Sequence, residues 1–169
     1  MKKAIMCLCL AITTFLTLPI AHVSADSLTP EKTETHDSES IVYYIDGATI
    51  EISAPRIISP FQSDLTVGTR SSTTAEIDAK YTNPSGTVEW KYTLHATFSY
   101  TYGVSSTCTS AWYTQNIYSG NWEFSNGAAT KSGNRASGTG VYEQKLLFIV
   151  IKTYNINLVL TCDKYGVVS

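Results

Sequence analysis

The sequence Val-Glu-Trp-Lys-Tyr-Thr-Leu-His-Ala-Thr-Phe-Ser-Tyr-Thr-Tyr occupies residues 88–102 and alternates apolar and polar side chains along its whole length. Successive side chains of a β-strand point to opposite faces, so this period of two predicts a strand with one buried face. Fifteen extended residues would span about 50 Å, much more than a typical strand. We therefore expect a bulge, a bend or a passage between two sheets within this segment.

The same alternation extends over most of the chain on either side. Turn-forming residues such as Asn83-Pro84-Ser85-Gly86 separate the alternating segments. No segment after residue 25 has a convincing helical period of 3.6. Seven or eight strands spaced about ten residues apart predict an all-β fold, either a single antiparallel β-sandwich or a partly open barrel. Besides residues 88–102, the expected strands are residues 73–81, 107–118, 121–125, 128–131, 135–144, 145–151 (a continuous apolar run) and 154–162.

Residues 1–25 predict a secretory signal peptide. Lys2 and Lys3 precede an uncharged, mostly apolar stretch, and Val-Ser-Ala at 23–25 offers a cleavage site before Asp26. The apolar stretch is interrupted by Thr and Pro and is shorter than the roughly 20 residues of a transmembrane anchor. We therefore expect a secreted, extracellular mature protein with no transmembrane anchor, and the signal is the one helix expected.

The mature chain is expected to have three short segments before its main domain. An acidic segment without apolar periodicity is typical of disorder. It is followed by two alternating segments around an Asp-Gly turn, which predict a hairpin that belongs either to the main domain or to a removable pro-segment. The predicted order is a disordered acidic leader (26–40), a β-hairpin (41–53), a linker (54–72) and the β-sandwich domain (73–169).

Charge in the mature chain excludes some partners. Residues 41–169 carry nine acidic and nine basic residues, and the excess of acids is confined to residues 26–40. The sequence has no basic stripe for nucleic acid and no cationic amphipathic helix for an anionic membrane. We expect no nucleic-acid partner, and the partner remains open between a cell-surface glycan and a protein.

Cys108 and Cys162 are the two cysteines that follow residue 25. In an oxidising compartment a disulfide between them is the default prediction, and in the chain-entropy model it would stabilise the fold by roughly 4 kcal/mol. Cys162 shares a face of its strand with Leu158 and Leu160, so it is expected to point inward. Two buried free thiols are the alternative, and no sequence feature lowers a thiol pKa as a catalytic cysteine requires.

The mature sequence contains no catalytic, cofactor or metal-binding motif. His95 is expected to lie exposed on the polar face of its strand, with no carboxylate nearby in sequence to orient it. HExxH, paired Cys-x-x-Cys and Asp-rich calcium motifs are missing from the sequence. Glu89, Glu123 and Glu143 are candidates for a glycosidase pair only by default, because such pairs form in space. We therefore expect no catalytic residue, no metal and no cofactor.

Aromatic side chains give the clearest functional signal. Trp and Tyr offer flat apolar rings with a polar tip, suited to stacking on a sugar or anchoring a partner protein. These residues favour a secreted, non-enzymatic binding module. One alternative is a secreted membrane-active toxin or bacteriocin-like β protein, because long amphipathic strands are long enough to cross a bilayer as hairpins; another is a secreted hydrolase. The candidate ligand-contact residues are Tyr113, Tyr118, Trp122 and Tyr142.

Two segments near the C-terminus carry a resemblance to known proteins. Ser-Gly-Asn-Arg-Ala-Ser-Gly-Thr-Gly at 132–140 and Leu-Val-Leu-Thr-Cys-Asp-Lys-Tyr-Gly at 158–166 resemble segments of small secreted proteins of Gram-positive bacteria that have no assigned function. The resemblance covers about the last hundred residues, and its motifs are structural. It implies secretion and a β fold, and it carries over no active-site residue.

Overall fold

The computed structural model describes residues 32–36, 40–59 and 66–169, with side chains from residue 40 onward. These residues form ten β-strands and no helix. The predicted signal peptide, residues 1–25, lies outside the described residues. The strands are β1 (Lys32–His36), β2 (Ser40–Ile45), β3 (Ala48–Ile52), β4 (Arg56–Ile57), β5 (Arg70–Thr82), β6 (Val88–Thr101), β7 (Ser105–Ile117), β8 (Trp122–Ser132), β9 (Arg135–Leu146) and β10 (Ile149–Thr161).

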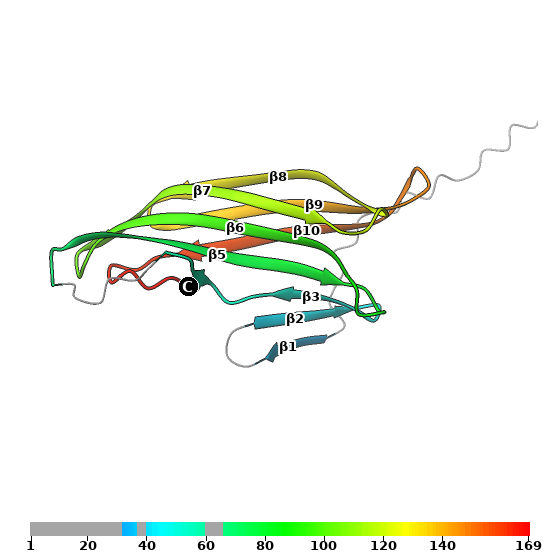
Figure 1. Cartoon of the computed structure of the whole chain (residues 1–169), viewed down its shortest axis with the longest axis horizontal. Coiled ribbons are helices and arrows are strands. Elements are labelled where there is room, and N and C mark those ends of the chain that lie inside the picture. Colours follow the sequence, from blue (N-terminus) through cyan, green and yellow to red (C-terminus); the bar gives the residue numbers. More distant parts are fainter. Residues whose placement is uncertain (1–31, 37–39, 60–65) are drawn as a thin grey trace, which may run out of the picture.

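The strands form two antiparallel sheets that pack against each other (Figure 1). The larger sheet has the order β1-β2-β3-β5-β6-β7, and β4 adds a short pairing to β5. The smaller sheet has the order β10-β9-β8. The prediction of an all-β fold is confirmed as two packed antiparallel sheets.

Strand β6 lies at the centre of the core, as its alternating sequence predicts. Its inward side chains are buried, including Trp90, Tyr92, Leu94 and Phe98. The expected irregularity is confirmed, because the pairing of β6 with β7 shifts register between Thr97 and Phe98. Apolar burial on this one strand therefore orients the larger sheet toward the smaller one.

One end of the core is closed by five aromatic rings contributed by both sheets. The rings of Trp90 on β6 and Tyr142 on β9 stack with their centroids 4.1 Å apart and their planes 8° from parallel. Such aromatic pairs add to the stabilisation that burial alone provides. We call this group the end cluster; its members are Tyr81, Trp90, Trp122, Tyr142 and Tyr154.

The N-terminal strands differ from the predicted leader, hairpin and linker. The β2–β3 hairpin forms as expected, and Asp46 and Gly47 have the positive φ values, 50° and 75°, that the Asp-Gly turn predicted. However, β3 pairs with β5, so the hairpin is continuous with the larger sheet. Strand β1 falls within the predicted disordered leader and β4 within the predicted linker. Edge pairing uses backbone groups, which sequence periodicity does not reveal.

Strand β8 also differs from prediction, because it is continuous where two short strands and a turn were expected. Asn126 and Gly127 lie within β8, next to a register shift between Phe124 and Asn126. A Cβ atom at Gly127 would lie 2.4 Å from the ring of Phe124. Gly127 therefore makes room for an aromatic ring inside a strand, a use of glycine that resembles a turn signal in sequence.

Close packing of the two sheets yields a prediction at Gly138 on β9. A Cβ atom there would lie 2.9 Å from both Leu94 Cδ1 and Tyr92 Oη of the opposite sheet. Gly138→Val should therefore lower the free energy of unfolding by about 1–3 kcal/mol through overpacking, measured by urea denaturation. Gly120→Val, where a Cβ atom meets nothing within 4 Å, is the control, and equal effects of the two substitutions would contradict this packing.

Candidate functional site

The structure places the four predicted ligand-contact aromatics in different surroundings. Trp122 and Tyr142 come together, but both are buried in the end cluster, with exposed fractions of 5% and 0%. Their polar tips are also occupied: Trp122 Nε1 donates to Glu89, and Tyr142 Oη donates to the Lys91 carbonyl oxygen at 3.0 Å. The predicted contact of these two residues with a ligand therefore receives no support from the geometry.

The other two aromatics do not form a platform together. Tyr113 is half-buried and stacks on Tyr92, with ring centroids 5.4 Å apart. Tyr118, in the loop after β7, is 61% exposed. Of the four candidates, Tyr118 alone presents most of its ring to solvent.

Cys108 and Cys162 are buried free thiols, so the predicted disulfide is not formed in the structure. The two residues nevertheless lie at the same end of the molecule. Cys108 N donates to Gly133 O at 2.7 Å, and Cys162 N donates to Asn134 O at 3.0 Å, so both bind the backbone of the β8–β9 turn. Burial raises the pKa of both thiols, which disfavours the reactive thiolate.

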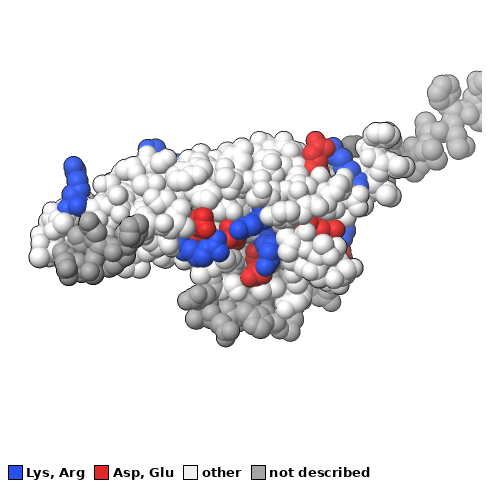
Figure 2. Space-filling model, viewed as in Figure 1, with Lys and Arg blue, Asp and Glu red and all other residues white. Residues whose placement is uncertain are grey.

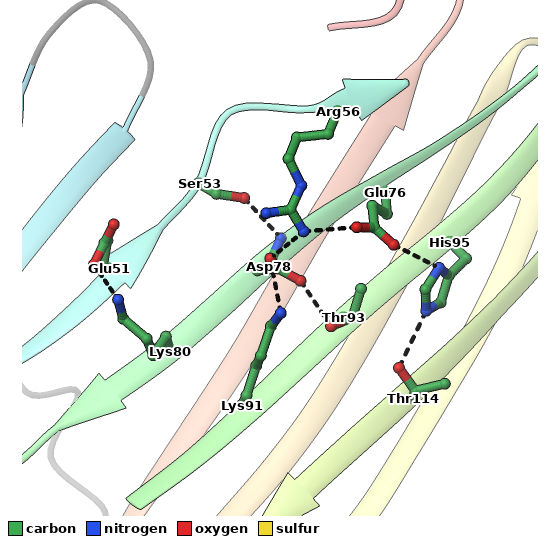
Figure 3. Close-up of polar contacts among 10 residues, drawn as sticks. All are labelled: Glu51, Ser53, Arg56, Glu76, Asp78, Lys80, Lys91, Thr93, His95 and Thr114. Atoms are coloured by element: carbon green, nitrogen blue, oxygen red, sulfur yellow. Dashed lines mark hydrogen bonds and ion pairs between the residues drawn. The ribbon is translucent and has the colours of Figure 1, made fainter. Parts of the chain in front are cut away.

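A network of charged side chains covers part of the outer face of the larger sheet (Figure 3). Asp78 on β5 is buried and accepts a hydrogen bond from Thr93 at 2.7 Å. It also pairs with Arg56 at 2.7 Å and with Lys91 at 3.0 Å. A cleft of about 210 Å³ lies among these groups. Its lining consists of Glu51, Ser53, Arg56, Asp78, Lys80 and Lys91.

The charges of this network neutralise one another. The remaining acids, Glu51 and Glu76, pair with Lys80 and Arg56 at 2.7 and 2.6 Å. Three acids therefore balance three bases, and a charged ligand would have to break an existing pair to bind. The network attaches β4 to the larger sheet and leaves no surplus charge to recognise a ligand.

His95 lies between a carboxylate and a hydroxyl, in an order that resembles a catalytic relay (Figure 3). Its Nδ1 atom is 3.2 Å from Glu76 Oε2, and its Nε2 atom is 3.1 Å from Thr114 Oγ1. The prediction that His95 lies exposed is wrong, because its side chain is only 14% exposed. A carboxylate that is distant in sequence orients it, since the β5–β6 register places Glu76 directly opposite. Glu76, His95 and Thr114 lie on three adjacent strands, β5, β6 and β7.

Metal binding has no candidate in the part of the chain with described side chains. Residues 40–59 and 66–169 contain no group of three or more His, Cys, Asp or Glu side chains placed to hold a metal ion.

The most unusual surface is the tip of the β9–β10 hairpin, which extends past the neighbouring strands (Figure 1). Six consecutive apolar side chains are exposed there. We call residues 146–151 the apolar tip. Their exposed fractions are 64% for Leu146, 86% for Leu147, 97% for Phe148, 69% for Ile149, 44% for Val150 and 48% for Ile151. Soluble surfaces rarely gather apolar side chains in one place, and such patches mark interaction sites.

The turn of this hairpin is made by residues that do not favour turns. Leu146 pairs with Ile149, so Leu147 and Phe148 are the two turn residues. Leu147 has a φ of 58°, in the left-handed region that costs a residue other than glycine about 1–2 kcal/mol. Glycine is the residue usually found at such a position. The chain thus has a large apolar side chain where glycine would relieve strain, a pattern associated with functional sites.

Charged and aromatic side chains border the apolar tip. Lys145 and Lys152 flank it in sequence and form ion pairs with Glu123 and Asp46, the latter at 3.2 Å. The loop that carries Tyr118 lies beside the hairpin, since Lys145 N donates to Asn121 O at 2.8 Å. An apolar projection is therefore bordered by paired charges and an exposed tyrosine.

The sequence prediction for residues 145–151 was a strand, and the apolar tip was missed. The available signal was the lack of alternation in Leu-Leu-Phe-Ile-Val-Ile between two lysines. A strand with one buried face needs alternation, while a run without it predicts burial on both sides. Here neither of the two described sheets covers the run, which its sequence alone does not reveal.

Comparison with known proteins identifies no relative. The chain matches no protein-family model, and it has no significant match among curated proteins or solved structures. No helix among the described residues is both long and apolar enough to span a membrane.

The buried thiols lead to a prediction about reactivity. In the reduced, folded protein, Cys108 and Cys162 should react with iodoacetamide more than about tenfold more slowly than in urea, because burial limits access and raises the thiol pKa. Intact-mass spectrometry of timed samples measures both rates. Similar rates in the folded and unfolded protein would contradict the burial, and a protein that takes no label in urea until reductant is added would reveal a disulfide.

Proposed function

We propose that this protein is exported and attaches to the surface of a lipid bilayer through the apolar tip. The observation that carries the proposal is the exposure of six consecutive apolar side chains at the end of a projecting hairpin. The signal-like residues 1–25 support export. Among the functions considered from sequence, the proposal is closest to the membrane-active protein, restricted to attachment.

The dimensions of the apolar tip favour shallow insertion. After the turn at Leu147 and Phe148, the three remaining apolar residues to Ile151 extend about 10 Å at the rise of an extended strand, while the hydrocarbon core of a bilayer is about 30 Å thick. Insertion of 5–10 Å is the depth that interfacial segments reach. In this conformation the tip can therefore enter one leaflet but cannot span the membrane.

The energetics favour weak, reversible attachment. Moving a fully exposed Leu, Ile or Phe side chain out of water contributes about 1.5–3 kcal/mol. Leu147, Phe148 and Ile149, the most exposed of the six, together contribute roughly 5 kcal/mol before the cost of association is subtracted. Tyr118 suits the headgroup region, where amphipathic rings are enriched.

A non-enzymatic role is part of the proposal. Two of the four aromatics predicted to contact a glycan, Trp122 and Tyr142, are buried in the end cluster. The charges of the polar network neutralise one another. The Glu76–His95–Thr114 arrangement lies on paired strands. The apolar tip exposes six apolar side chains to water, which is unfavourable without a partner. A lipid surface would remove all six from water at once.

Attachment should depend on the turn residues of the hairpin. Leu147→Ser combined with Phe148→Ser should lower retention on phosphatidylcholine vesicles at least about tenfold, because the two most exposed apolar groups are replaced. Vesicle flotation measures retention, and circular dichroism of the same samples checks that the β fold is unchanged.

The matched control is Val104→Ser, which replaces an exposed apolar residue in the β6–β7 turn at the opposite end of the molecule. It should float like the wild type. If the wild type is retained on neither zwitterionic nor anionic vesicles, the proposed function is wrong, and a protein partner with an apolar pocket becomes the better explanation.

A further inference from the structure

Charge is distributed unequally between the two ends of the molecule. Residues 40–59 and 66–169 carry eight acidic and nine basic residues. The central network is neutral, and Figure 2 shows charges gathered near the middle of one face and beside one end. The end with the β8–β9 turn carries Arg70, Lys131, Arg135 and Lys164 against Asp163.

The end that bears the apolar tip has the opposite sign. Among the residues with described side chains, the six charged ones at this end comprise four acids and two bases, an excess of two negative charges. Both bases are already paired, Lys145 with Glu123 and Lys152 with Asp46. The six residues are Asp46, Glu89, Glu123, Glu143, Lys145 and Lys152.

The β8–β9 register concentrates this negative charge beside the hairpin. It places Glu123 directly opposite Glu143. Like charges in direct opposition on a sheet are unfavourable. Here one cation, Lys145, interacts with both acids and forms an ion pair with Glu123. The two lysines that flank the apolar tip therefore cannot act as a free basic pair for anionic headgroups.

We infer that the apolar tip selects zwitterionic bilayers, such as phosphatidylcholine surfaces, over anionic ones. The inference rests on the proposed function and adds to it the class of lipid. Apolar insertion alone does not distinguish headgroups, because the hydrocarbon below them is the same. An anionic surface attracts nearby Lys and Arg and repels Asp and Glu, so an excess of two acids at the inserting end disfavours it.

The test compares vesicles of phosphatidylcholine alone with vesicles that contain phosphatidylserine as well. At an ionic strength of about 0.01 M, where the screening length is roughly 30 Å, the wild type should bind the anionic vesicles at least about tenfold more weakly. At about 1 M the screening length falls to roughly 3 Å, so the difference should vanish. Flotation over a series of lipid concentrations measures both affinities.

Two double variants identify the charges responsible. Glu123→Gln with Glu143→Gln removes the local excess, and it should bring the two affinities within about threefold at low salt. Arg135→Gln with Lys164→Gln also changes the net charge by two, but at the far end and in the opposite sense, making the protein more negative, and it should retain the wild-type selectivity.

Each failure has a separate meaning. Equal or stronger binding of the wild type to anionic vesicles at low salt overturns the inference while the proposed function stands. A clear increase in selectivity in the far-end variant, which is more negative by two charges, would assign the selectivity to total charge and also overturn the inference. Failure of the wild type to bind either vesicle overturns the proposed function itself.

Discussion

The stacking of Trp90 on Tyr142 joins the two sheets at the end from which the hairpin projects. Around this pair, with centroids 4.1 Å apart, the other rings of the end cluster fill the space between the sheets. Beyond these rings, the described side chains of the larger sheet include no further buried aromatic, whereas β9 and β10 continue to the turn at Leu147. The end cluster thus determines both where the core stops and where the apolar tip begins.

The exposed hairpin follows from that boundary. A two-stranded ribbon has no sheet to cover either face once it leaves the core, so apolar side chains on both faces meet water. Leu147 adds backbone strain at the turn, and a glycine would remove both costs. Exposed apolar surface and backbone strain therefore coincide at this tip, while the remaining core is well packed. This coincidence is the physical basis for proposing that the tip contacts a lipid surface.

Much of the fold could be predicted from the sequence, because the alternation of β6 reports directly on which side chains are buried. The continuity of β8 was not predictable, since Gly127 accommodates Phe124 and yet looks like a turn. The site was predicted less well. Trp122 and Tyr142 are residue types that are common on binding surfaces, but packing between the two sheets buries them. Glu76 reaches His95 through strand register, and the apolar tip depends on where the opposite sheet ends, so neither has a local sequence signal.

The central claim is that the turn of the β9–β10 hairpin enters the hydrocarbon of a bilayer. Phe148→Cys, made in a chain that starts at Asp26 and so lacks Cys7 and Cys9, leaves Cys108 and Cys162 as the other thiols, and both are buried. An environment-sensitive fluorophore on this cysteine reports from the most exposed of the six apolar positions. On addition of phosphatidylcholine vesicles, the account predicts a blue-shifted, brighter emission that lipids with a quencher on the upper acyl chain suppress. Unchanged emission from protein that floats with the vesicles would contradict it.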